Sequence, residues 1–143
     1  MAEMTRTLVE RLWQATLWPG AAHDGLPGTP GAVEGGIART GPRTWTGWEA
    51  EPPALDPERG AVADLGHARV RFSIPGEAGR EAMRRLVPLD LRDRAFPEGR
   101  LKATTAHHVG VWVHRDAEGW HLWAPTTFAD SMAELLEETL EGV

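Results

Sequence analysis

The sequence contains no cysteine and no tyrosine, only one lysine, and only two serines, Ser73 and Ser131, among its 143 residues. Without cysteine there can be no disulfide, no thiolate nucleophile and no cysteine-based zinc site. Neither serine lies in a G-x-S-x-G elbow, and no Walker loop or G-x-G-x-x-G motif is present. We therefore predict no catalytic residue and no cofactor, and these absences argue against an enzyme. Catalysis by two carboxylates stays open, because it requires only that the fold bring two acids together.

Long apolar runs are missing as well. No segment approaches the roughly 18 apolar residues that a membrane-spanning helix needs. The first residues mix charged with apolar side chains and lack the apolar block of a signal peptide. We therefore expect a cytoplasmic protein without membrane contact. The formal net charge of −6 argues against a general affinity for phosphate backbones, so nucleic-acid binding is the least favoured function.

The richest stretch of the sequence is 107–124, which reads HHVGVWVHRDAEGWHLWA. Two β-branched and aromatic runs flank Asp116-Ala117-Glu118-Gly119, a tetrapeptide suited to a reversing turn, so the stretch predicts a β-hairpin. We expect a three-residue loop with a glycine bulge, in which Asp116 pairs with Trp120. A longer loop would instead place His114 opposite His121 and Trp112 opposite Trp123. In either register both faces carry large aromatics, so we expect one face in the core and the other under a helix, a loop or a partner.

Other segments carry simpler patterns. Apolar residues at helical spacing predict helices over 5–18, 77–87 and 127–142, the last capped by Thr126 or Thr127. Alternation of apolar residues with arginine and serine predicts a strand ending at Ile74, paired through a turn at 64–67 with 61–63. A further strand is expected over 101–105, and 92–99 reads as a polar surface loop.

The segment 19–60 differs in composition, because Gly and Pro supply 16 of its 42 residues. Such a segment cannot be regular throughout, although 36–39 and 44–50 are short enough to be strands. Trp45 and Trp48 lie three residues apart, and a bulge at Gly47 would bring both rings to one side. We expect these tryptophans to attach an irregular segment to the body of the protein.

Together these patterns predict a single α+β domain over residues 1–143. We expect an antiparallel sheet of four to six strands with two or three helices packed mainly on one face. The Gly/Pro-rich segment 19–60 would be irregular.

The leading functional hypothesis is a small non-enzymatic binding or accessory protein, with a protein partner or a second copy as its ligand. Tryptophan and arginine are enriched at the dominant positions of protein interfaces. The predicted binding residues lie on the hairpin and in the Gly/Pro-rich segment: Trp112, His114, His121, Trp123, His108, Trp45 and Trp48. The alternative is a small-molecule-binding or catalytic domain, with a pocket between the sheet and 19–60.

Metal binding is not expected from the sequence. The alternative hairpin register would bring His114 and His121 together, but a third ligand is needed. Asp116 and Glu118 belong to the turn and are expected to point into water, so no acid lies at ligand spacing. We therefore predict partly buried, hydrogen-bonded histidines.

Overall fold

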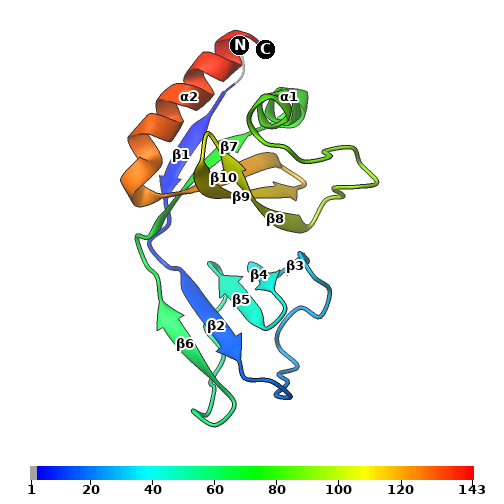
Figure 1. Ribbon diagram of the computed structural model, residues 1–143, viewed down its shortest axis with the longest axis vertical. Helices are drawn as coiled ribbons and strands as arrows, with labels where there is room; N and C mark the ends of the chain where they lie inside the picture. The colour runs from blue at the N-terminus through cyan, green and yellow to red at the C-terminus, as the bar shows by residue number, and fades with distance from the viewer. Residues whose placement is uncertain (1–2) are drawn as a thin grey trace. The chain divides into compact units, whose positions relative to one another are not determined.

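The computed structural model describes residues 3–143 and divides the chain into two compact units, which Figure 1 shows with their strands and helices labelled. The first unit contains residues 3–8 and 69–143, and the second contains Val9–Ala68. Each unit is built around one five-stranded antiparallel sheet. Whether the two units form the single domain that the sequence predicts stays a prediction.

The sheet of the first unit has the strand order β1-β7-β10-β9-β8, and every neighbouring pair is antiparallel. Its strands are β1 (Thr5–Leu8), β7 (Arg69–Ile74), β8 (Arg100–Ala106), β9 (Val109–Asp116) and β10 (Gly119–Pro125). Helix α1 (Gly76–Leu86) follows β7, and α2 (Ala129–Glu141) follows β10 through the short 3-10 turn η1 (Thr126–Phe128). The expected hairpin is therefore present as β9 and β10.

The core of this unit joins both helices to alternate residues of the strands. In β7, Val70, Phe72 and Ile74 are buried, whereas Arg69, Arg71 and Ser73 between them are half-buried, as a period of two requires. Helix α1 contributes Met83 and Leu86, and α2 contributes Met132 and Leu136, all spaced along one stripe of each helix. This apolar packing fixes the register of the sheet, because a slip of one residue would reverse the faces.

The sheet of the second unit has the order β3-β4-β5-β2-β6. Its strands are β2 (Trp13–Leu17), β3 (Val33–Glu34), β4 (Ile37–Gly41), β5 (Thr44–Gly47) and β6 (Gly60–Asp64). The core is small and consists of Trp13, Ala15, Leu17, Ile37 and Trp45. Gly47 lies against the ring of Trp13, where an added Cβ would come within 2.1 Å of the indole. Glycine at this position therefore makes room for the ring and marks no bulge, since the irregularity lies between Arg39 and Gly41.

The prediction of a helix over 5–18 is wrong. Residues 5–8 pair with β7 in the first sheet, and residues 13–17 pair with β5 and β6 in the second. The buried residues Trp13, Ala15 and Leu17 follow the two-residue period of a strand. Pairing with partners that are distant in the sequence here overrides the local helical spacing.

Two smaller predictions are also wrong. Residues 61–63 belong to β6, which pairs with β2 and not with β7. Helix α2 begins after Phe128, and no side-chain hydrogen bond caps it there. The loop expected over 92–99 is confirmed, and within it Phe96 is fully buried and packs edge to face with Trp120 at a centroid distance of 5.1 Å.

The described fold is thus mixed α+β, with two five-stranded antiparallel sheets and two helices within residues 3–143. The packing of the helices mainly on one face stays a prediction. The short strands expected near 36–39 and 44–50 are confirmed as β4 and β5, and the helix expected near 77–87 is confirmed as α1.

Candidate functional site

The hairpin β9–β10 separates its side chains by chemistry. Val111, Val113, Trp120 and Leu122 point into the core of the first unit. The intervening residues form the opposite face of the sheet, here called the second face. On β7, β9 and β10 the second face carries Arg69, Arg71, Ser73, Trp112, His114, Asp116, His121 and Trp123.

The hairpin adopts the alternative register and not the preferred one with a glycine bulge. His114 lies opposite His121, and Trp112 lies opposite Trp123. Asp116 and Gly119 pair directly, so the loop contains only two residues, and the expected three-residue bulge is wrong. Asp116 explains the short loop, because its Oδ1 accepts the backbone N–H groups of Glu118 (2.9 Å) and Gly119 (3.2 Å).

Gly119 contributes to the same turn. It adopts a φ of 142°, and an added Cβ would lie 2.7 Å from the carbonyl oxygen of Ile74. A side chain at this position would therefore disturb the pairing of β10 with β7. The turn thus depends on Asp116 for hydrogen bonds and on Gly119 for space.

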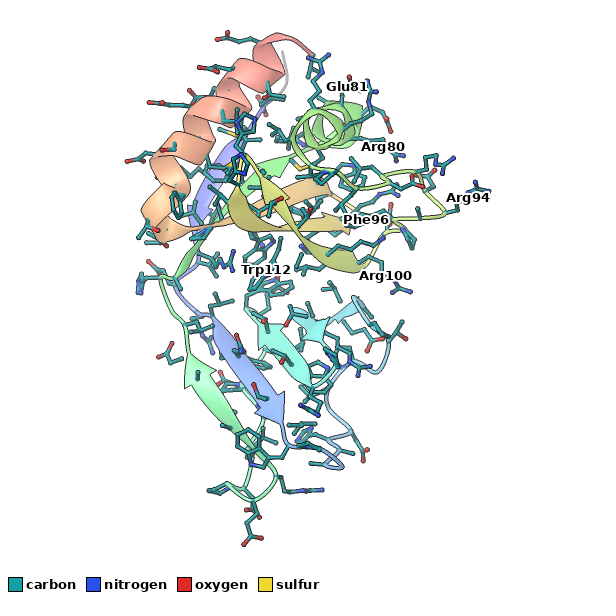
Figure 2. All side chains as sticks on the ribbon, viewed as in Figure 1. Arg80, Glu81, Arg94, Phe96, Arg100 and Trp112 are labelled. Carbon is teal, nitrogen blue, oxygen red and sulfur yellow. The ribbon has the colours of Figure 1, made fainter. Side chains whose placement is uncertain are left out.

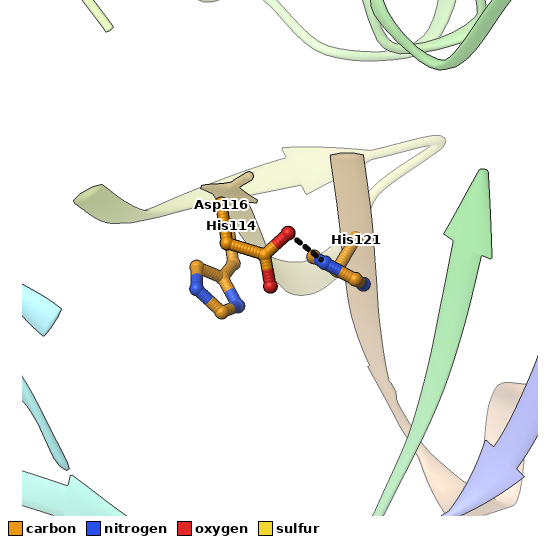
Figure 3. A group of neighbouring side chains, drawn as sticks. All are labelled: His114, Asp116 and His121. Atoms are coloured by element: carbon orange, nitrogen blue, oxygen red, sulfur yellow. Dashed lines mark ion pairs between the residues drawn. The ribbon is translucent and has the colours of Figure 1, made fainter. Parts of the chain in front are cut away.

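The two histidines form a buried cross-strand pair. Their ring centroids are 5.0 Å apart, and His114 and His121 are 4% and 3% exposed. Asp116, expected to point into water, instead places Oδ1 2.9 Å from Nε2 of His121, as Figure 3 shows. The other ring nitrogen of His121, Nδ1, lies 2.7 Å from Oγ of Ser73. A line of contacts therefore runs from Ser73 through His121 to Asp116.

Burial and charge set the ionisation of this group. Burial lowers the pKa of His114 to about 4, and the nearby His121 and Arg71 act in the same direction, whereas Asp116 acts against them. Burial acts to raise the pKa of Asp116, but hydrogen bonds from His121 and from the Glu118 backbone outweigh it and lower that pKa. At neutral pH the site therefore holds a neutral His114 and a carboxylate at Asp116.

Aromatic and cationic side chains continue the second face beside the histidines. The guanidinium of Arg69 lies 4.1 Å from the ring centroid of Trp112, and that of Arg71 lies 5.4 Å from the ring of Trp123. The two indoles are 5.9 Å apart. Trp123 is fully buried, whereas Trp112, labelled in Figure 2, is half-buried. Contacts at these distances are cation–π interactions, which hold each indole against an arginine.

Four of the seven predicted binding residues are thus brought together on the second face. His108 lies in the turn between β8 and β9, is exposed and adopts a φ of 68°. Trp45 and Trp48 belong to the second unit, where Nε1 of Trp45 donates to the carbonyl oxygen of Pro27 at 2.8 Å. This hydrogen bond joins two parts of the segment 19–60 to each other, and attachment of that segment to the body of the protein by Trp45 and Trp48 stays a prediction. The pocket predicted between the sheet and 19–60 stays a prediction.

Ser73 and Asp116 also belong to this group, although neither is among the predicted binding residues. Ser73 could have been found from the alternation of β7, which puts it on the same face as the arginines. Its neighbour across the sheet, His121, follows only from the pairing of β7 with β10. Asp116 was expected to point into water because it belongs to the turn, yet it lies on the same face of β9 as His114.

The arrangement offers two kinds of chemistry. The Ser73–His121–Asp116 line resembles a nucleophile–base–acid relay, and a cavity of about 180 Å³ is lined by Ser73, His121, Thr5 and Glu118 among others. Alternatively, His114, Asp116 and His121 provide two imidazoles and a carboxylate whose donor atoms lie within 4.8 Å of one another. This second set matches the donors that transition-metal ions take in proteins.

No helix within residues 3–143 is both long and apolar enough to cross a membrane.

Comparison with known proteins gives a likeness of fold. No protein-family model matches the sequence, and no curated protein matches it. Among solved structures, the chain is similar to a chain of the heterotetrameric sarcosine oxidase from Corynebacterium sp. U-96, determined in complex with pyrrole 2-carboxylate. The TM-score is 0.80 at 23% identity, and the match covers 99% of this chain and 84% of that chain. At this identity the likeness shows that the two chains share a fold.

Proposed function

We propose that this chain is a non-catalytic accessory subunit of a hetero-oligomeric enzyme, of the kind to which its structural neighbour belongs. The observation that carries the proposal is the extent of the likeness, which covers 99% of the chain. A protein built throughout like a subunit of a heterotetramer is a candidate for the same kind of assembly. The lack of a G-x-S-x-G elbow, a Walker loop or a G-x-G-x-x-G motif in the sequence agrees with a subunit that leaves the reaction to its partners.

The proposed contact surface is the second face of the hairpin, centred on Trp112. Trp112 is the half-buried tryptophan of this face, so part of its ring is available to a partner. Arg69 holds the indole in place at 4.1 Å, and a ring that is already held loses little freedom on binding. Tryptophan and arginine are also the side chains that most often dominate interface energies.

Isolation of the assembly tests this proposal. The full chain, tagged and expressed in its native cells, is purified gently and examined by native mass spectrometry and by sarcosine-dependent oxygen consumption. We expect a stoichiometric complex with other subunits that consumes oxygen, whereas the isolated chain consumes none. A monomer or homodimer without stoichiometric partners, or turnover by the isolated chain, would contradict the proposal.

A pair of variants tests the contact surface separately. Trp112→Ala removes the central indole of the second face, and Trp18→Ala removes a 42% exposed indole of the second unit. We expect the first variant to reduce recovery of the complex and the second to leave it unchanged. If both variants assemble like the unaltered chain, the assembly uses another surface.

A further inference from the structure

The group His114, Asp116 and His121 has a geometry that the accessory function does not use. Within the described residues 3–143 it is the one group of three histidine or carboxylate side chains whose donor atoms all lie within 4.8 Å of one another. All three residues belong to the hairpin: His114 and Asp116 lie two residues apart on β9, and His121 is the cross-strand neighbour of His114. The strand pairing therefore preorganises the set.

We propose that His114, Asp116 and His121 bind a divalent transition-metal ion of the zinc type, with the fourth coordination position open to a small ligand. Zinc bound at about 2.0–2.1 Å to three such donors would hold them roughly 3.4 Å apart. Nε2 of His121 and Oδ1 of Asp116 already lie 2.9 Å apart, and the other donor separations are at most 4.8 Å. Small side-chain rotations within the existing backbone would complete the site.

Ser73 provides the support that a metal-binding histidine usually has. Such a histidine donates its second ring N–H to an oxygen, which fixes both its tautomer and its orientation. Oγ of Ser73 lies 2.7 Å from Nδ1 of His121, in position to accept that hydrogen bond. The Nε2 lone pair of His121 would then face the ion, and the contact of Nε2 with Asp116 would be replaced by two metal bonds.

The donor set also decides which ion class fits. Calcium and magnesium prefer shells made entirely of oxygen, whereas imidazole with one carboxylate suits zinc and neighbouring divalent metals. The carboxylate of Asp116 is 37% exposed, so the ion can reach the set from the turn. Arg71 opposes binding, since its positive charge is close enough to act on His114.

The test uses the full chain, freed of metal with a chelator and titrated with Zn²⁺ by calorimetry and with Co²⁺ by visible absorption. We expect one ion per chain and, with Co²⁺, the absorption bands of a low-coordinate site. Asp116→Asn should weaken binding by about ten-fold or more. Glu137→Gln, which removes an exposed carboxylate of α2 outside the site, should leave the affinity unchanged.

Two further variants separate the site from other histidines and from weakened folding. His114→Gln removes one ligand and should abolish tight binding. Arg71→Gln should strengthen binding several-fold, because it removes the opposing charge. Thermal unfolding of each metal-free variant identifies those that fold. The proposal is overturned if the unaltered chain binds no Zn²⁺, if folded Asp116→Asn binds as tightly as Glu137→Gln, or if Arg71→Gln weakens binding. The proposal is independent of assembly with other subunits.

Discussion

The two faces of the hairpin β9–β10 are built from the same two strands but differ in what they contribute. The core face carries Val111, Val113, Trp120 and Leu122, all buried among apolar side chains. The second face buries two histidines and a tryptophan beside arginines, a serine and an aspartate. The first arrangement stabilises the fold, whereas the second retains ionisable groups that a purely structural sheet does not need.

The largest effect is expected from the core face. Leu122 is fully buried between strands and helices of the first unit. Leu122→Ala should lower the free energy of unfolding by about 2–5 kcal/mol, because it removes buried methyl groups and leaves a cavity. Chemical denaturation measures the loss. A loss below 1 kcal/mol would mean that this face is not the main source of stability.

The second face should make the stability depend on pH. The pKa of His114 falls from 6.5 in the unfolded chain to about 4 in the fold, so between these values the unfolded chain binds more protons. The fold should therefore lose about 3 kcal/mol as the pH decreases from 6.5 to 4, and the full contribution is present above pH 6.5. Unfolding curves across this range measure the slope. His114→Gln should flatten it, and an unchanged slope in that variant would assign the effect to another group.

A smaller effect is expected at Ser73. Ser73→Ala leaves the buried Nδ1 of His121 without the hydroxyl that lies 2.7 Å from it. Loss of one partner of a buried polar group should cost about 1–3 kcal/mol. Ser73→Thr retains the hydroxyl and serves as the matched variant, and a loss in Ser73→Ala no larger than that in Ser73→Thr would contradict a contribution from the hydrogen bond.

The smallest effect on stability should come from Trp112. It is half-buried and is held mainly by Arg69, and such a cation–π contact contributes about 0.5–1 kcal/mol at a partly exposed position. Trp112→Ala should therefore unfold at nearly the same denaturant concentration as the unaltered chain while losing assembly. A stability loss as large as that of Leu122→Ala would place Trp112 with the core.

The sequence predicted the first unit better than the second face. Alternation in β7 and helical spacing in α1 and α2 were visible locally, because each element buries one side against a single large core. The strands β1 and β2 were read as one helix, since their spacing fits a helix and their pairing partners lie far away in the sequence. Local patterns could not report that residues 5–17 pair with two different sheets.

The candidate site could be predicted only in part, because a local pattern reveals its hairpin residues but not their cross-strand neighbours. His114, His121, Trp112 and Trp123 were selected from the hairpin pattern alone. Asp116 and Ser73 joined them only when the register and the β7–β10 pairing were known. One hydrogen-bonded side chain, Asp116, selects the two-residue turn and so decides which residues meet across the strands.

Footprinting of the assembled protein tests most directly the claim that the second face contacts a partner. Hydroxyl-radical labelling followed by mass spectrometry compares each indole in the isolated chain and in the purified complex, with Trp18 of the second unit as the internal reference. We expect labelling of Trp112 to decrease several-fold in the complex while that of Trp18 stays the same. Equal labelling of Trp112 in the two states would contradict it.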